Sequence, residues 1–129
     1  MDELRICDGL TAYSSYWDAS QEKRDRNCNG AGTAGWRGAL VPDTIYGLNI
    51  NAAANIHDWD YAVGESLAHK KSADFRFQKN MISIIRRAAR RSWVSWFLKI
   101  PREYRAFGYY LAVSETGSAL EAFRASEFK

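Results

Sequence analysis

From residue 50 onward, apolar residues recur at the three-to-four spacing of an α-helix. In the stretch Asn51–Gly64, an asparagine stands where helices are often capped and a glycine stands where they often stop. Residues three and four apart share one face of a helix. On this helix that face carries Ile50, Ala53, Ala54, His57 and Tyr61. The two alanines are small, so we expect another element to approach this face closely.

A second helical pattern follows, and it opens on a charged residue. Ser72 can cap this helix, and Pro101 limits its end. Its buried stripe is predicted to contain Asp74, Phe77, Met81, Ile84, Ile85 and Ala88. The short polar connection before it contains His69, which we expect to be exposed. A short connection favours antiparallel packing of the two helices.

The flanking regions complete an all-α prediction. A third helix is expected from Arg102 to about Val113, and a short final helix is expected after Gly117. The third helix is predicted to turn Tyr104, Phe107, Tyr110 and Leu111 toward the core. The first forty-odd residues are rich in Gly, Asn, Asp and Ser, and we expect them to be irregular. The prediction is a single domain over residues 1–129, with two antiparallel central helices and additional C-terminal helices.

Composition restricts the class of protein without choosing a function. Hydrophobic residues make up 47% of the chain and the net charge is +3, which favours a folded domain with no strong electrostatic preference. Cys7 and Cys28 are expected to be two free thiols in a reducing compartment, and a single disulfide between them is the alternative. We find no signal peptide and no apolar stretch long enough to span a bilayer. A soluble or peripherally attached protein is therefore expected.

His57 and Asp74 are the first candidates for chemistry. A buried carboxylate is costly unless it is paired, and the partners within reach of Asp74 are His57 and Tyr61. A carboxylate that accepts one imidazole N–H fixes the tautomer and leaves the other ring nitrogen able to take a proton. Such a pair can activate water. The alternative is a structural pair that only ties two helices together.

Asp58 adds a candidate metal ligand. It points about 100° around the helix from its neighbour His57, so it faces a different surface. The stretch Cys28–Trp36 is rich in glycine and can present backbone carbonyls and N–H groups. A carboxylate with several carbonyls and water is typical of a calcium site, and clustered N–H groups can bind an oxyanion. By itself, a glycine-rich stretch is usually only a turn.

Several motifs now coincide. A His-Asp-x-x-Tyr motif occupies His57–Tyr61, and the residues Asn51–Asp58 that lead into it read Asn-Ala-Ala-Ala-x-x-His-Asp. The second helix contains an Ala-Asp-x-x-Phe segment at Ala73–Phe77. A Gly-x-Gly motif occupies Gly30–Gly32.

Together these residues, from about position 28 to position 85, resemble the phospholipase A2 superfamily. The likeness is to its disulfide-free branch, which includes the phospholipase domains of parvovirus capsid proteins. Similar small domains occur among phage and prophage proteins. The resemblance, together with the missing signal peptide, implies a cytoplasmic or phage-particle location.

The resemblance also implies roles for the helical residues. His57 would deprotonate a water molecule that attacks the sn-2 ester of a glycerophospholipid. Asp74 would orient His57 and stabilise its charged form, and Tyr61 would support Asp74. The partner would be the surface of a phospholipid bilayer.

The same resemblance implies a Ca²⁺ cofactor. Asp58 would bind the ion together with backbone carbonyls of Cys28, Gly30 and Gly32. The ion and the N–H of Gly32 would stabilise the oxyanion. The alternative function is a non-catalytic helical module that keeps this scaffold and binds a membrane or a protein, for instance in a phage particle.

A basic and aromatic segment stands apart from these motifs. It contains Arg86, Arg87, Arg90, Arg91, Trp93, Trp96 and Phe97. Three interpretations remain open. The arginines form a solvated face while the aromatic residues complete the core, the segment binds an anionic membrane surface, or, as the least favoured, it binds nucleic acid.

Overall fold

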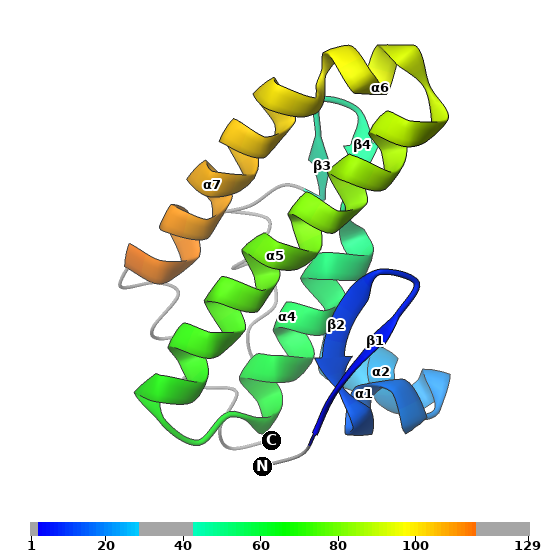
Figure 1. Cartoon of the computed structure of the whole chain (residues 1–129). Coiled ribbons are helices and arrows are strands. Elements are labelled where there is room, and N and C mark those ends of the chain that lie inside the picture. The colour runs from blue at the N-terminus through cyan, green and yellow to red at the C-terminus, as the bar shows by residue number, and fades with distance from the viewer. Residues whose placement is uncertain (1–2, 29–42, 116–129) are drawn as a thin grey trace.

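The computed structural model describes residues 3–28 and 43–115 (Figure 1). Helices dominate these residues. They are α1 (Ser14–Asp18), α2 (Gln21–Cys28), α4 (Asn51–Val63), α5 (Leu67–Arg91), α6 (Trp93–Phe97) and α7 (Lys99–Glu115). Two antiparallel hairpins accompany them, β1 (Leu4–Cys7) with β2 (Leu10–Tyr13) and β3 (Thr44–Ile45) with β4 (Leu48–Asn49). The mostly helical prediction is confirmed, but the hairpins, α1 and α2 lie in segments expected to be irregular. The predicted final helix lies outside the described residues.

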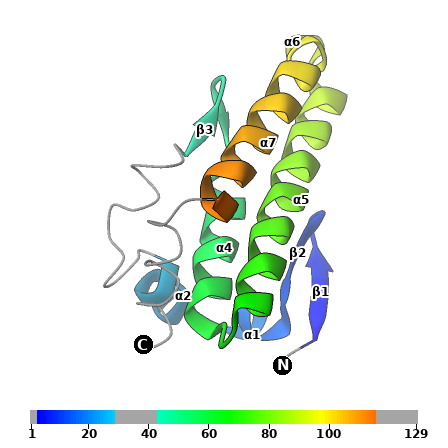
Figure 2. The ribbon, with the colours of Figure 1, turned by 90° about the vertical axis from the view of Figure 1, so that its left-hand side faces the viewer.

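Three long helices form the centre of the fold. α4 and α7 both run antiparallel to α5, and the three lie side by side in two perpendicular views (Figures 1 and 2). Small residues of α4 and α7 let them approach α5, as the sequence predicts for α4. The main core cluster contains Ile45, Ile50, Ala53, Ala54, Phe77, Met81, Ile85, Ala106, Tyr109 and Val113. The predicted faces of α4 and α5 are therefore confirmed.

The predicted face of α7 is wrong. Tyr104 is 82% exposed and Phe107 is 46% exposed, whereas Ala106 and Tyr109 are buried. The reason is a tertiary contact. The buried guanidinium of Arg102 donates to the carbonyls of the β3–β4 hairpin, which fixes the rotation of α7 about its axis.

The limits of α5 also differ from the prediction. Ser66 caps the helix by accepting a hydrogen bond from the backbone N–H of His69, so the helix begins five residues before Ser72. His69 is half-buried in the first turn and not in an exposed loop. At the other end, Ser92 has an extended backbone and caps α6, so the helix stops well before Pro101. A side-chain cap competes here with continuation of the helix.

The start of α4 differs in a smaller way. Asn51 is the first helical residue, and Ile50 occupies the cap position without a side-chain hydrogen bond. The side chain of Asn49 accepts from the backbone N–H of Asn51 instead. Gly64 follows the last residue of α4, as predicted.

A buried amide helps to dock the β1–β2 hairpin on α5. Its turn places Asp8 and Gly9 at positive φ, which suits an Asp-Gly pair. Asn80 of α5 accepts from the backbone N–H of Thr11 at 2.8 Å and donates to its carbonyl at 2.9 Å. The hairpin therefore covers one side of α5, while β3 lies on the other side of the helices (Figure 2). Among the described residues, no helix is long and apolar enough to cross a membrane.

Candidate active site

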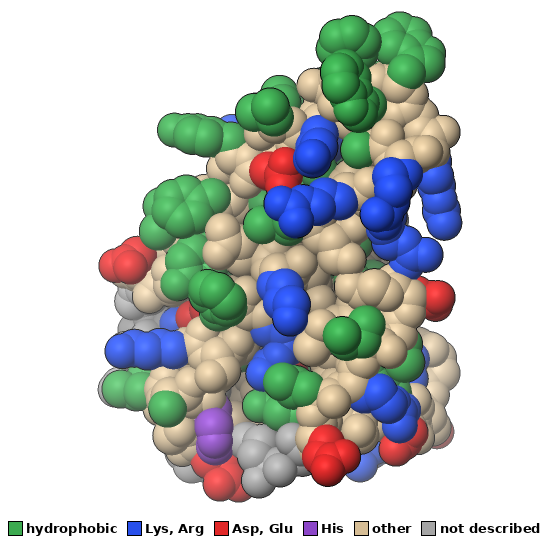
Figure 3. Space-filling model, viewed as in Figure 1, with side chains coloured by type: hydrophobic (Ala, Val, Ile, Leu, Met, Phe, Trp, Pro, Cys, Tyr) green, Lys and Arg blue, Asp and Glu red, His purple; other side chains and the backbone are tan. Residues whose placement is uncertain are grey.

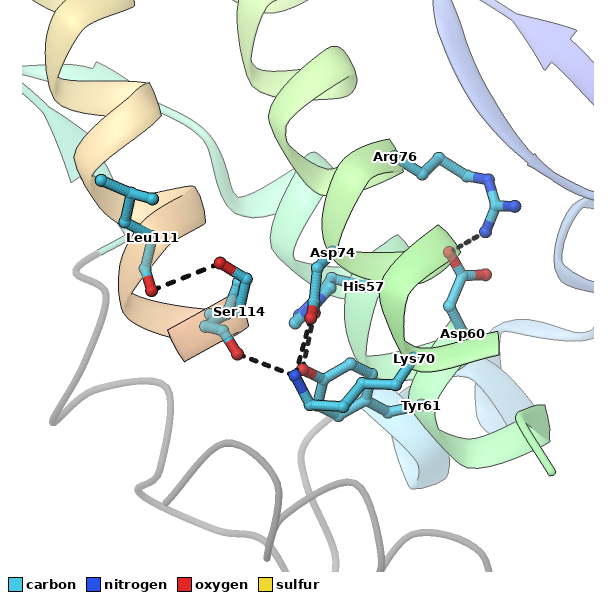
Figure 4. Close-up of polar contacts among 9 residues, drawn as sticks. His57, Asp60, Tyr61, Lys70, Asp74, Arg76, Leu111 and Ser114 are labelled. Carbon is cyan, nitrogen blue, oxygen red and sulfur yellow. Dashed lines mark hydrogen bonds and ion pairs between the residues drawn. The ribbon is translucent and has the colours of Figure 1, made fainter. Parts of the chain in front are cut away.

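His57 and Asp74 meet between α4 and α5. Nε2 of His57 lies 2.8 Å from Oδ1 of Asp74, and both residues are only 1% exposed (Figure 4). His57 stands on the face of α4 that also carries Ala53 and Ala54, which explains why α5 comes close enough for contact. An ionised Asp74 favours the tautomer that carries its hydrogen on Nε2. This tautomer puts the lone pair of the ring on Nδ1.

Tyr61 completes the contact and limits the position of the imidazole ring. Its hydroxyl donates to the same oxygen of Asp74 at 2.6 Å. The centre of its ring lies 4.2 Å from that of His57, and Phe77 stacks on the histidine at 4.7 Å. Burial, followed by the charge of Asp74, raises the pKa of Tyr61, so its hydroxyl remains a donor. The structure thus brings together three residues singled out from the sequence.

Lys70 is a fourth member that the sequence analysis missed. Its ammonium group donates to Oδ2 of Asp74 at 2.7 Å and to the carbonyl of Val113 in α7 at 2.9 Å. Lys70 is 6% exposed, so the carboxylate neutralises a cation that water hardly reaches. The i, i+4 spacing of Lys70 and Asp74 was the available signal. A helix that starts at Ser72 would leave Lys70 outside it, so the expected helix start gave this spacing no meaning.

A second buried ion pair lies beside this cluster. Arg76 donates to Oδ2 of Asp60 at 2.6 Å, and its guanidinium lies over the ring of Tyr13. Burial raises the pKa of Asp60 to about 7, although the charge and hydrogen bond of Arg76 lower it. Asp60 points away from the cluster at Asp74 (Figure 4). This pair therefore connects α4, α5 and the β1–β2 hairpin.

Asp58 and Cys28 bear on the expected calcium site. Asp58 is 6% exposed on α4. Cys28 ends α2, and its thiol donates to the carbonyl of Asn55, which lies one turn before Asp58 on the same helix. The chain therefore leaves α2 close to the surface of α4 that carries Asp58. Both Cys7 and Cys28 are free thiols, as expected.

The remaining calcium ligands are not among the described residues. Gly30 and Gly32 lie in the stretch 29–42, outside the part of the chain that the structure describes. Within the described part, no group of three or more His, Cys, Asp or Glu side chains could hold a metal ion. Calcium takes six to eight oxygen ligands. Asp58 fits the chemistry of one ligand, and the others would have to be backbone carbonyls or water.

The basic and aromatic segment is not part of this site. Trp93, Trp96 and Phe97 are each more than 60% exposed. The interpretation that these aromatic residues complete the core is wrong, because Ser92 ends α5 and turns α6 outward. Arg86, Arg90 and Arg91 are exposed as well, and Arg87 is half-buried and donates to the carbonyl of Asp8.

A surface groove also lies elsewhere. It has a volume of about 540 Å³ and runs between the β1–β2 hairpin and α5, with walls that include Ile6, Phe75 and Ile82. Neither His57 nor Asp74 lines it. The groove is the more open feature, but the paired titratable residues lie on a different face of α5.

Comparisons of the chain with protein-family models, with curated proteins and with solved structures found no match. The function is therefore inferred from the geometry of the site. That geometry is a buried histidine held by a carboxylate that also accepts from a tyrosine and a lysine.

Proposed function

We propose that this chain is a calcium-dependent hydrolase of the phospholipase A2 type, which cleaves the sn-2 ester of glycerophospholipids. The observation that supports it is the contact between Nε2 of His57 and Oδ1 of Asp74 across two antiparallel helices. A general base needs such a partner to fix its tautomer and to stabilise the charge it acquires. Tyr61 on the same carboxylate oxygen supports this orientation further.

The proposed reaction uses the second ring nitrogen. Nδ1 of His57 takes a proton from water while the water oxygen attacks the carbonyl carbon of the sn-2 ester. Asp74 stabilises the imidazolium that forms. The ester C–O bond then breaks, and the imidazolium returns its proton to the departing glycerol oxygen. The products are a fatty acid and a lysophospholipid, and the histidine is neutral again.

The calcium part of the proposal rests on Asp58. Its carboxylate would bind the ion together with carbonyls of Cys28, Gly30 and Gly32. When bound, calcium supplies positive charge that stabilises an oxyanion. The backbone N–H of Gly32 would donate a hydrogen bond to the same oxyanion.

Lys70 favours a second candidate function. Its ammonium group neutralises Asp74 within the cluster, so the carboxylate has less negative charge to offer an imidazolium. The cluster also joins α4, α5 and α7, as a structural element would. A non-catalytic helical module, which keeps the scaffold and binds a membrane or a protein, is therefore the alternative.

The two candidates differ in one experiment. Vesicles of phosphatidylcholine and phosphatidylglycerol are incubated with the protein in millimolar calcium or in excess chelator, and fatty acid release is measured. His57→Gln is compared with His69→Gln, which changes the other histidine of the chain. Glutamine can still donate a hydrogen bond to Asp74 but cannot act as a base near neutral pH. We expect release by the wild type and by His69→Gln, and a decrease of about 100-fold or more in His57→Gln.

Two outcomes would count against the hydrolase. Equal release by wild type and His57→Gln would show that another group, or a contaminant, is responsible. No release from any vesicle, with all proteins folded, would favour the non-catalytic module.

A further inference from the structure

One end of the molecule carries a group of exposed apolar side chains. We call it the aromatic tip. It consists of Trp93, Val94, Trp96, Phe97, Ile100 and Tyr104, all between 48% and 82% exposed. α6 lies at this end in Figure 1, and apolar side chains project from the same end in Figure 3. Exposed apolar patches of this kind usually mark an interaction site.

The aromatic tip is held in place by its own contacts. The rings of Trp93 and Phe97 meet edge to face at 5.7 Å, and those of Trp96 and Phe97 do so at 5.3 Å. Arg102 of α7 donates to the hydroxyl of Ser95 in α6, which fixes the turn between the two helices. The aromatic residues are therefore presented on a rigid support. Tryptophan and tyrosine are enriched at membrane–water interfaces, because each has an apolar body with a polar edge.

Positive charge surrounds the aromatic tip. Residues 86–105 contain seven Lys or Arg and a single acidic residue, Glu103, leaving eleven basic and fourteen acidic residues in the rest of the chain. The net positive charge of the protein is thus concentrated at this end. We call Arg86, Arg87, Arg90 and Arg91 the basic collar. Glu103 pairs with Arg86 at 3.1 Å.

The spacing of the two features matches a bilayer surface. At 1.5 Å per helical residue, Arg86 and Arg87 lie about 6 to 8 Å before Arg91 at the end of α5. Interfacial helices bury their apolar side chains about 5 to 10 Å into the boundary between headgroups and acyl chains. If the aromatic tip enters to that depth, Arg86 and Arg87 lie at the level of the lipid phosphates, and Arg90 and Arg91 lie between that level and the inserted side chains.

We propose that the aromatic tip inserts into the surface of an anionic phospholipid bilayer, with the basic collar binding lipid phosphates. The tip is a projecting end, which suits a membrane better than it suits a pocket on another protein. Pairing of two copies through the tip would bring two basic collars together, and like charges would oppose it. An anionic bilayer complements both features at once.

This anchor is separate from the candidate active site. Asp74 precedes Arg91 by seventeen residues of α5, which places it about 25 Å from the end of the helix. The inserted tip therefore does not itself bring lipid to His57. The proposal concerns binding and not hydrolysis, so it can hold or fail independently of the proposed reaction.

Vesicle sedimentation tests the anchor in the absence of calcium. The vesicles contain phosphatidylcholine alone, or phosphatidylcholine and phosphatidylglycerol in equal parts. We expect binding to the anionic vesicles only, and weaker binding at high salt. Arg90→Gln with Arg91→Gln should reduce it about 30-fold, or about fivefold for each arginine. Trp93→Ser with Trp96→Ser should reduce it at least about tenfold.

Matched controls change exposed residues away from this end. Leu67→Ser removes an exposed apolar side chain at the other end of α5, and Arg26→Gln with Lys71→Gln removes two exposed charges elsewhere. Both controls should bind like the wild type. Equal losses in controls and tip variants would overturn the proposal. Binding that is the same on neutral and anionic vesicles would also overturn it.

Fluorescence identifies the residues that enter the bilayer. Lipids brominated on their acyl chains should quench tryptophan emission in the wild type. Trp93→Phe with Trp96→Phe should still bind, yet its emission should be quenched far less. Persistent quenching in that variant would mean that another tryptophan contacts the lipid, and would overturn the proposal. Sedimentation velocity in buffer, without lipid, tests whether the tip binds a second copy of the chain. Self-association of the wild type that is lost in the double serine variant would show that it does, and would overturn the proposal.

Discussion

The two ends of α5 use side chains in opposite ways. Near its start, Lys70 and Asp74 are buried and meet polar groups from α4 and α7. Just beyond its end, Trp93 and Trp96 are exposed and lie beside arginines. A buried ionic cluster is expensive to remove one member at a time, whereas exposed aromatic residues contribute little to the folded state. We therefore expect the first end to control stability and, in the proposed hydrolase, the reaction, and the second end to control the proposed membrane binding.

The largest expected effect is that of Asp74→Ala. It leaves the ammonium of Lys70 buried without its carboxylate and removes the acceptor of His57 and Tyr61. We expect the free energy of unfolding to fall by about 3 to 5 kcal/mol, measured by urea titration. The control is Asp18→Ala, which breaks the exposed pair with Arg5 and should cost far less, because solvent screens that pair. Similar losses in the two variants would contradict the claim that the buried cluster at Asp74 stabilises the fold more than an exposed ion pair does.

Lys70→Met should have a smaller effect on stability and a different effect on hydrolysis. Asp74 keeps the hydrogen bonds of His57 and Tyr61, so we expect a loss of about 2 to 3 kcal/mol. If the proposed reaction operates, an unneutralised Asp74 stabilises the imidazolium more strongly. The rise of the hydrolysis rate with pH should then move to higher pH, while Asp74→Ala loses the activity. If the pH dependence of the hydrolysis rate is the same in Lys70→Met and in the wild type, Lys70 has no influence on the reaction.

Asp60→Asn should change how stability depends on pH. The pKa of Asp60 is raised from 3.8 to about 7, so between these values the folded protein binds more protons than the unfolded chain does. This carboxyl therefore makes the free energy of unfolding fall as pH rises from about 4 to 7, by at most about 1.4 kcal/mol per pH unit. Above pH 7 its contribution is constant. In Asp60→Asn, the free energy of unfolding should lack this fall between pH 4 and pH 7. The control Asp25→Asn changes an exposed carboxyl and should keep the fall.

The smallest effect on stability is expected at the aromatic tip. Trp93→Ser and Trp96→Ser should each change the free energy of unfolding by less than about 0.5 kcal/mol. Trp59→Ser provides the contrast, because Trp59 is 2% exposed in the core, and its loss should cost about 3 to 5 kcal/mol. Chemical denaturation of the three variants measures these changes in the free energy of unfolding. A large loss at the tip would mean that it supports the fold, and its role as a surface anchor would lose its basis.

The sequence predicts the faces of α4 and α5 well, because their apolar residues follow one helical period. It also predicts the contact of His57 with Asp74, since a carboxylate on a buried stripe needs a partner. The role of Lys70 was not predicted, because Ser66 and Ser72 are both residues that can cap a helix. Only the tertiary structure selects Ser66. The β1–β2 hairpin has its own local signal in the sequence, an Asp-Gly turn between two short runs that can form strands.

Two other features do not follow from the period of apolar residues along a helix. The buried face of α7 is selected by the hydrogen bonds of Arg102 to a hairpin more than fifty residues away in the chain. The exposure of Trp96 depends on the break at Ser92, where a serine that many helices tolerate caps a new helix instead. Aromatic residues in a helical pattern suggest a core, and here that suggestion was wrong.

The most direct test of the hydrolase is the position of the bond it cleaves. The substrate is a phospholipid with different acyl chains at sn-1 and sn-2, presented in mixed vesicles with calcium, and mass spectrometry identifies the acid released by the wild-type protein. The proposed chemistry at His57 and Asp74 predicts release of the sn-2 acid only, with a lysophospholipid that keeps the sn-1 chain, and no release in chelator. Release of both acids in equal amounts, or of neither, would contradict it.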